Sequence, residues 1–406
     1  MKRHRIFAVA LCIVFAIILS ACAAGTNIAQ TPKQNQSDLE NSPAAPPSAT
    51  AEIIQPTETP DPYDIRVREI MANMSLTDKI CQLIAIRPEV LGGSYPTVNI
   101  SDEIKEKLRD YPVSGIILTI VNLKTREQTL NLASELQAAS KIPLFIAADE
   151  EGGKVSRLMK VLGTTKFNSM YSYKAEGSET AYQNALTIGT DMLSCGFNTN
   201  FAPVADVWTN PANKVIGERA YSDDYQEAAD LVSAAVRGFS DSGIVSCIKH
   251  FPGHGDTEED SHVEAAILNK DKEELFSGEL IPFINGINAG ADMVMMGHIT
   301  VPAIDSKPAS MSRAIVTDLL REELSYSGVI VCDSVEMGAV ADIKEPERCL
   351  EILKAGVDII LGVSDLEQTV EHIKAAAEKG EYSLDDLDLS VYRVLMLKAK
   401  KGIIPL

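Results

Sequence analysis

The chain lacks features that would place it in several common classes of protein. It is poor in positive charge: 57 Asp and Glu against 37 Lys and Arg leave a formal charge of −20. A surface of that sign repels nucleic acid and anionic membrane surfaces, so neither is expected as a partner. The seven cysteines include no Cys-x-x-Cys pair, so a zinc knuckle is not expected either.

The chain also lacks a hydrophobic run that is clearly long enough to cross a membrane. The apolar run Ile6–Leu19 is shorter than the roughly 20 residues that a spanning helix needs. Because three Lys or Arg residues precede it, we assign residues 1–21 to an export signal. Small residues stand directly before Cys22, which resembles a bacterial lipobox. The resemblance implies cleavage before Cys22, lipid on its sulfur, and attachment to the extracytoplasmic face of the cell membrane. A plain signal peptide or an uncleaved anchor is the alternative.

The next segment has little that could form a core. Residues 22–62 are rich in Pro, Ser and Thr, and we predict a disordered linker there. The globular domain is expected over 63–406. Five cysteines lie within it, an odd number mostly placed in apolar runs, which indicates buried free thiols. They are Cys81, Cys195, Cys247, Cys332 and Cys349.

Eight short apolar runs divide the globular part, and helix-like segments such as Gln226–Ser242 separate them. The runs are Ile80–Ile86, Val113–Leu118, Leu144–Ala148, Gly196–Ala202, Ile244–Ile248, Asp292–Met296, Val329–Cys332 and Asp358–Leu361. Runs of this length, rich in Val and Ile, are typical of parallel strands buried on both faces. The sequence therefore predicts an α/β fold with one (β/α)8 TIM barrel as a single catalytic domain. A doubly wound sheet is the alternative, because periodicity does not report closure.

Polar residues follow four of these runs. The segments Asp149–Gly153 and Lys249–Asp256 follow the third and fifth runs, and His298 and Asp333 follow the sixth and seventh. In a barrel these positions meet at one mouth, where such folds place their sites. Crowding charge in this way is costly unless a site requires it.

The densest of these segments, Lys249–His262, reads KHFPGHGDTEEDSH and holds three of the six histidines. Asp260 and His262 stand two residues apart, so the carboxylate could orient the imidazole for acid/base chemistry. A zinc site that adds His250 and His254 is the alternative, although the spacing matches no standard zinc signature. His254 by itself could serve only to shape the loop.

This segment resembles the signature of the β-N-acetylglucosaminidases of glycoside hydrolase family 3. Four other segments resemble that family in the same order along the chain: Asp149–Gly153 with Arg157, Asn200–Asp206, Gly217–Arg219 and Val331–Met337. The resemblance covers about 75–363. The family's fold over this part is a (β/α)8 barrel, which agrees with the eight apolar runs.

The resemblance implies a role for each matching residue. Asp333 would be the nucleophile, and His262 the general acid and then the general base, with Asp260 as its partner. The residues expected to grip the sugar are Asp149, Arg157, Arg219, Lys249 and His250. Lys249 and Arg219 near Asp333 would keep its carboxyl ionised. A glycan is the expected substrate, with no metal, no cofactor and a monomeric chain.

The expected activity is that of a retaining exo-β-N-acetylglucosaminidase acting on peptidoglycan fragments. A phosphorylase or β-glucosidase on the same barrel and a non-catalytic glycan-binding lipoprotein remain alternatives. Many family members carry a second α/β domain after the barrel, and we expect none in this chain. Glu150 replaces the commoner Gln and adds negative charge near the site, whereas His298 is expected to serve the structure.

Overall fold

The computed structural model of the protein describes residues 61–258 and 266–406. The predicted signal segment, Cys22 and the predicted linker up to residue 60 lie outside this part of the chain. Asp260 and His262 also lie outside it. The description below concerns the unit Thr59–Leu406 alone. Its first helix, α1 (Pro62–Ala72), begins one residue before the predicted start of the domain.

Eight parallel strands form the central sheet, one for each predicted run. They are β1 (Ile84–Ile86), β2 (Gly115–Ile117), β3 (Phe145–Ala148), β4 (Thr199–Asn200), β5 (Val245–Phe251), β7 (Met293–Met296), β9 (Val329–Cys332) and β10 (Ile360–Leu361). Their order is β10-β1-β2-β3-β4-β5-β7-β9, so each strand lies beside the next along the chain. A parallel bridge from Val331 to Ile359 joins the two ends of this order. The predicted TIM barrel is therefore confirmed, and the doubly wound alternative is excluded.

Most strands are shorter than the predicted runs, and two of the differences at their boundaries have a clear local cause. Ile80 and Cys81 end helix α2 (Leu76–Cys81), because a capping box between Ser75 and Asp78 starts a helix there. Strand β5 runs past its predicted end at residue 248, since its ladder with β7 continues through Lys249. Lys249 and His250 therefore stand on the strand itself and not in the loop after it.

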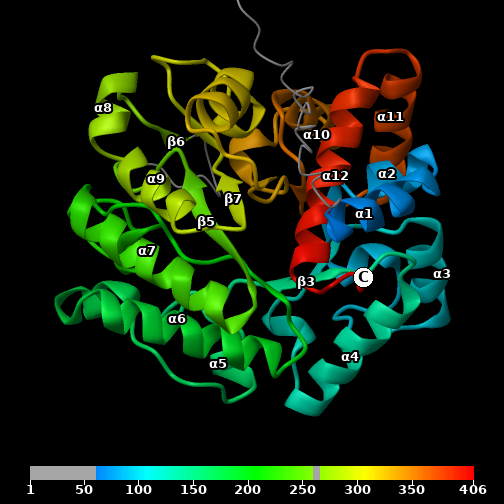
Figure 1. Cartoon of the computed structure of the whole chain (residues 1–406), viewed down its shortest axis with the longest axis horizontal. Coiled ribbons are helices and arrows are strands. Elements are labelled where there is room, and N and C mark those ends of the chain that lie inside the picture. Colours follow the sequence, from blue (N-terminus) through cyan, green and yellow to red (C-terminus); the bar gives the residue numbers. More distant parts are fainter. Residues whose placement is uncertain (1–60, 259–265) are drawn as a thin grey trace, which may run out of the picture. The chain divides into compact units, whose positions relative to one another are not determined.

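Helices follow the strands and surround them (Figure 1). The longer ones are α3 (Asp102–Asp110), α4 (Arg126–Ala139), α6 (Ser178–Leu193), α7 (Tyr225–Ser242), α9 (Leu280–Asn288), α10 (Glu345–Ala355), α11 (Leu366–Glu378) and α12 (Leu384–Lys400), with a π-helix at Ala314–Glu323 and the short helices α5 (Leu158–Val161) and α8 (Lys272–Ser277). Helix α7 confirms the helix expected at 226–242. Its apolar residues line one face that is buried against the barrel, which is the pattern of an amphipathic helix.

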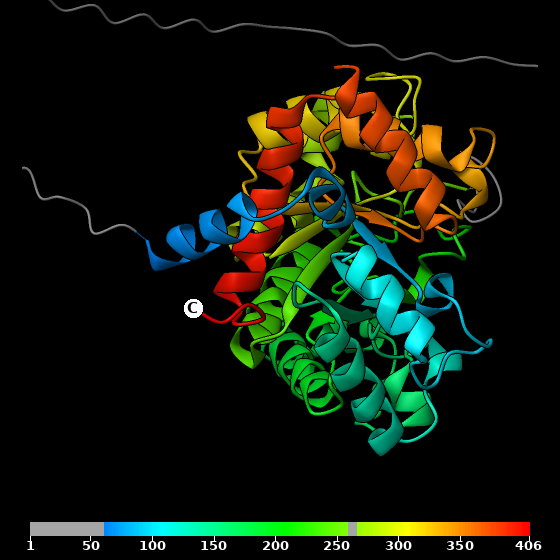
Figure 2. The same cartoon turned by 90° about the vertical axis from the view of Figure 1, so that its right-hand side faces the viewer.

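The strands alternate between two hydrophobic clusters. Phe145 and Ala147 of β3 point into the barrel, where Met293 of β7 also packs, while Ile146 faces the surrounding helices. Helix α12 adds Val394 to the interior cluster. Figure 2 shows α12 beside α1. The barrel interior is thus a packed core, and a pocket can form only at the ends of the strands.

The five cysteines of the domain are all free and buried, as predicted. No helix in the described part of the chain has the length and apolar content needed to cross a bilayer.

Candidate active site

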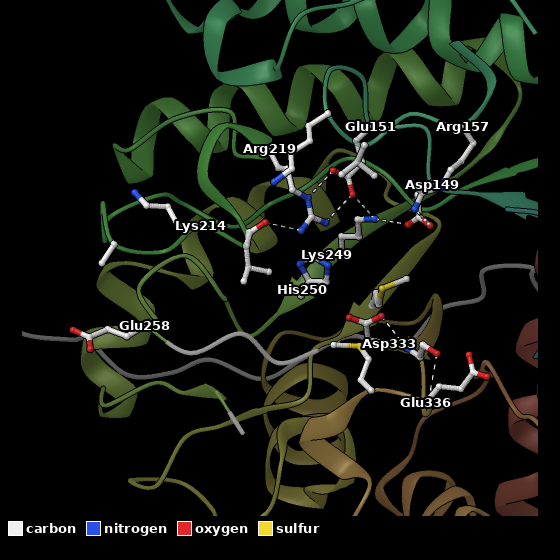
Figure 3. A pocket seen from close by; sticks show the side chains of 17 residues that line it. Asp149, Glu151, Arg157, Lys214, Arg219, Lys249, His250, Glu258, Asp333 and Glu336 are labelled. Atoms are coloured by element: carbon white, nitrogen blue, oxygen red, sulfur yellow. Dashed lines mark hydrogen bonds and ion pairs between the residues drawn. The ribbon is translucent and has the colours of Figure 1, made fainter. Parts of the chain in front are cut away.

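A pocket of about 750 Å³ opens where the strands end. All six predicted site residues that the structure describes line it: Asp149, Arg157, Arg219, Lys249, His250 and Asp333 (Figure 3). Lys249 and His250 come from β5, and the other four come from the segments that follow β3, β4 and β9. The structure therefore brings together residues that span 149–333 of the chain, as the barrel prediction required.

Asp333 follows β9 and faces His250 across the pocket (Figure 3). Its main-chain N–H donates to the Met296 carbonyl at 2.8 Å, and its Oδ1 accepts the Ser334 N–H at 2.7 Å. Burial alone would raise the pKa of the Asp333 carboxyl, but the imidazoles of His250 and His298, with smaller contributions from the Ser334 N–H and Lys249, lower it. The carboxyl is therefore held ionised, as a nucleophile must be.

His250 is oriented by a buried carboxylate. Its Nδ1 lies 2.7 Å from Oδ2 of Asp206, and the His254 main-chain N–H donates to the other oxygen at 2.6 Å. Burial would raise the pKa of Asp206, but its charge and hydrogen-bond contacts with His250 and His254 together lower it. Asp206 was not among the predicted site residues, although it ends the Asn200–Asp206 segment that resembles the family, and that position was the available signal.

Glu151 is a second residue that the sequence reasoning missed. Arg219 donates to its two oxygens from Nε and Nη2, both at 2.8 Å, and Lys249 Nζ lies 2.7 Å from Oε1. Only 3% of the Glu151 side chain is exposed. Burial would raise its pKa, but the charges of Lys249 and Arg219 lower it instead. Its place in the Asp149–Gly153 segment was the signal that could have found it.

The cations predicted to keep Asp333 ionised are therefore largely used elsewhere. Arg219 forms its ion pair with Glu151, and Lys249 bridges Glu151 and Asp149. The larger lowering of the Asp333 pKa comes from His250, and Lys249 makes a smaller contribution. The guanidinium of Arg219 is directed at Glu151, whose two oxygens match its fork-shaped pair of donors.

Asp149 and Arg157 form the exposed part of this charged cluster. Asp149 Oδ1 accepts from Lys249 Nζ at 2.8 Å, and its Oδ2 lies 3.6 Å from Nη2 of Arg157. About 30% of each side chain remains exposed, 31% for Arg157 and 30% for Asp149. These two side chains can therefore reach a bound molecule without breaking a buried contact.

Glu150 serves a helix and does not line the pocket. Its carboxylate accepts the main-chain N–H groups of Arg157, Leu158 and Met159 at 2.5, 2.8 and 3.2 Å, at the start of α5. Burial raises the pKa of this carboxyl, although the three hydrogen bonds oppose that effect. The negative charge expected near the sugar is thus directed at a helix N-terminus.

The two remaining histidines of the barrel mouth have structural contacts. His298 is buried, with Nδ1 2.7 Å from Ser310 Oγ and Nε2 3.0 Å from the Ser334 carbonyl, which agrees with its expected structural role. His254 Nδ1 lies 2.8 Å from Thr257 Oγ1. Within 61–258 and 266–406, no group of three or more His, Cys, Asp or Glu is placed to hold a metal ion. The alternative zinc ligands Asp260 and His262 lie outside those ranges.

Comparison with known proteins gives concordant matches. The family model "Glycosyl hydrolase family 3 N terminal domain" matches residues 75–397. Beta-hexosaminidase A of Pseudoalteromonas piscicida is 35% identical over 329 residues, which are 73% of this chain and 55% of that protein. This chain therefore spans about half the length of that relative.

Two solved structures extend the comparison. A glycoside hydrolase family 3 beta-N-acetylglucosaminidase from Paenibacillus has a TM-score of 0.76 and 35% identity, over 81% of this chain and 63% of that one. A beta-N-acetylhexosaminidase from Beutenbergia cavernae has a TM-score of 0.71 and 28% identity, over 82% of this chain and 99% of that one. The match therefore covers nearly the full length of one solved protein.

Proposed function

The chain belongs to glycosyl hydrolase family 3, and we propose that it is a retaining exo-β-N-acetylglucosaminidase, which removes terminal β-linked N-acetylglucosamine from glycans. The observation that carries this proposal is the placement of Asp333: an ionised carboxylate at the end of β9, facing the Asp206-oriented His250 across an open pocket. The names of the similar proteins, beta-hexosaminidase and beta-N-acetylglucosaminidase, support the choice of sugar.

In the first step, a carboxylate oxygen of Asp333 attacks the anomeric carbon, and the bond from that carbon to the leaving oxygen breaks. The leaving oxygen takes a proton from His262, whose imidazole Asp260 orients and charges. The product is a glycosyl-enzyme on Asp333. The two-residue spacing of Asp260 and His262 within the family-like segment supports these roles.

In the second step, His262 removes a proton from water, and the hydroxide attacks the same carbon. The bond to Asp333 breaks, and the carboxylate is restored. Two inversions give net retention. An imidazole suits both steps because its pKa lies near working pH, so it can donate and then accept a proton.

The sugar-binding roles divide between exposed and buried members of the charged cluster. Asp149 and Arg157 are the exposed pair, and we assign them to direct hydrogen bonds with sugar hydroxyls. Lys249 is only 2% exposed and joins Asp149 to Glu151, so it acts chiefly by fixing Asp149. Arg219 holds Glu151 and thereby supports Lys249.

The test is hydrolysis of p-nitrophenyl β-N-acetylglucosaminide by the full-length chain in detergent, with p-nitrophenyl β-glucoside as the control substrate. We expect activity on the acetamido sugar alone. Asp333→Ala should abolish it, and His262→Ala should reduce it by roughly 10²- to 10⁴-fold, the usual range for a general acid. Equal turnover by wild type and Asp333→Ala would contradict the mechanism. Release of the sugar 1-phosphate when phosphate is added would instead identify a phosphorylase, and an inactive wild type would favour a glycan-binding protein.

We further propose that the chain is anchored by lipid on Cys22 at the extracytoplasmic face of the cell membrane, where peptidoglycan fragments would be its substrate. The lipobox-like residues before Cys22 support the anchor. The expected result is that Cys22→Ala releases the protein from the membrane fraction without changing its specific activity. Retention of Cys22→Ala in membranes after a high-salt wash would argue for an uncleaved anchor.

A further inference from the structure

A partly buried ion-pair cluster joins residues that stand before and after the segment containing Asp260 and His262. Lys270 Nζ lies 3.2 Å from Asp256 Oδ2, donates to the Tyr225 hydroxyl at 3.0 Å and pairs with Glu279. The Tyr225 hydroxyl in turn donates to Glu279 Oε1 at 2.8 Å. In the sequence, Asp256 precedes His262 and Lys270 follows it. The cluster therefore connects the two flanks of the segment that carries the proposed acid/base pair.

The flank before the segment is fixed to the barrel. Thr209 donates to the second oxygen of Asp256 at 3.0 Å. Gly255 lies so close to the Val207 carbonyl that a Cβ at this position would be 1.7 Å from the carbonyl oxygen. Asp256 thus presents its carboxylate to Lys270 from a backbone that has little freedom to shift.

The flank after the segment is fixed separately. The short strand β6 (Ala266–Ile267) pairs with β8 (Ile299–Thr300), and the Leu268 N–H donates to the Thr300 carbonyl at 2.9 Å. Lys270 follows directly, before α8. Its ammonium group is the only cation that the described contacts place on Asp256, so it supplies the link between flanks that are otherwise held by different parts of the barrel.

The cluster is shielded from water at Glu279 and partly exposed at Asp256. The side chain of Lys270 is 19% exposed, that of Glu279 only 2% and that of Asp256 34%. Burial lowers the pKa of Lys270, but the bonds to Glu279 and Tyr225 outweigh this and raise it above its ordinary value. The ammonium group therefore stays charged, and removing it would leave the Glu279 carboxylate buried without its cation.

We propose that Lys270 is a positioning residue for proton transfer: by holding Asp256 and Glu279 together, it fixes the spacing between the two flanks of the segment that carries Asp260 and His262. This inference rests on the proposed function. If the ion pair only stabilised the fold, its removal would lower kcat/KM for all substrates alike. A positioning residue acts through His262 and therefore affects only those substrates that require its proton.

The experiment compares kcat/KM for two aryl β-N-acetylglucosaminides, with full-length protein in detergent. The phenyl glycoside has a poor leaving group that needs a proton, and the 2,4-dinitrophenyl glycoside leaves without one. Lys270→Met should lower kcat/KM for the phenyl substrate by roughly tenfold and for the dinitrophenyl substrate by less than about twofold, as expected when only acid catalysis is misplaced. The matched control is Lys272→Met, whose exposed ion pair is with Glu323 and not with Asp256 or Glu279, so both rates should be unchanged.

A double-mutant cycle gives the decisive readout. Adding Lys270→Met to His262→Ala should change kcat/KM by less than about twofold, because residues that act through one group are non-additive. Equal losses on both substrates, or a further tenfold loss in the His262→Ala background, would overturn the positioning role while leaving the proposed function intact. An inactive wild type would overturn the proposed function and this inference together.

Milder substitutions keep the inference testable if Lys270→Met does not fold. Tyr225→Phe removes one hydrogen bond from the cluster, and Asp256→Asn weakens the ion pair on one flank. Each should show the same selective loss on the phenyl substrate, reduced to about threefold. Wild-type selectivity in both folded variants would refute the role of Lys270.

Discussion

At the scale of single residues, the pocket depends on Glu151, a carboxylate that is almost fully enclosed. Its oxygens are satisfied by Arg219 and Lys249 at 2.7 to 2.8 Å, so the cost of burying its charge is offset. The same bonds hold Lys249 against Asp149. Glu151 therefore organises the cluster although it has little surface to offer a substrate.

Glu151→Gln should destabilise the protein by about 3–5 kcal/mol at pH 7, because both cations would lose their buried partner. The pKa of Glu151 is lowered on folding, so its stabilising effect is present above the ordinary value of 4.5 and is lost as pH falls toward the folded value. The difference in free energy of unfolding between wild type and Glu151→Gln should thus narrow below pH 4.5. Urea unfolding at several pH values measures it.

Glu336→Gln is the matched control for that prediction. Glu336 lines the same pocket, but its ion pair with Arg87 is exposed, so its loss should cost less than about 1 kcal/mol. Equal destabilisation by the two variants would show that burial of Glu151 is not the source of its effect.

At the scale of elements, helix α5 owes its start to Glu150. A helix of four residues has little stability of its own, and its first N–H groups have no partner within the helix. Glu150 accepts three of these N–H groups, including that of Arg157. A buried side chain beside the pocket thereby determines where an exposed sugar-binding candidate lies.

Glu150→Ala should cost about 1–2 kcal/mol, the usual loss for an N-terminal cap, and raise KM more than it lowers kcat. Glu150→Gln keeps one acceptor oxygen. It loses a negative charge that burial already disfavours, as the raised pKa of the Glu150 carboxyl shows, so its free energy of unfolding should stay within about 1 kcal/mol of wild type. Chemical unfolding and steady-state kinetics test both variants. A Glu150→Gln variant as damaged as Glu150→Ala would mean that the charge itself is required.

At the scale of the whole domain, α12 closes one end of the barrel core. Its residue Val394 packs with the interior cluster, and Lys398 is completely buried below it. The Lys398 ammonium group donates to Gln82 Oε1 at 2.8 Å and lies 5.0 Å from the centre of the Phe145 ring. Burial with so few partners lowers the pKa of Lys398 well below its usual range.

This buried amine predicts a pH-dependent stability. The unfolded chain keeps the Lys398 proton up to about pH 10.4, whereas the folded chain releases it at a lower pH. Between the two pKa values the unfolded state binds more protons, so the stability of wild type relative to Lys398→Met should rise with pH, by up to about 1.4 kcal/mol per pH unit. Thermal unfolding from pH 6 to 10 tests this. A constant difference would mean that Lys398 stays protonated in the fold.

The eight apolar runs were sufficient to predict the eight strands, because burial on both faces leaves a local pattern in each strand, but they did not report closure of the sheet. The polar residues after the runs predicted four members of the pocket, and the family resemblance added Arg157 and Arg219. The ends of α2 and β5 were misplaced, since capping and ladder pairing compete there with hydrophobicity. Only the tertiary structure identified the partners: Lys249 and Asp149 are 100 positions apart, and Arg219 and Glu151 are 68 apart. Which charges neutralise each other depends on how the strand ends are arranged in space, and the residues next to a side chain in the sequence do not determine that arrangement.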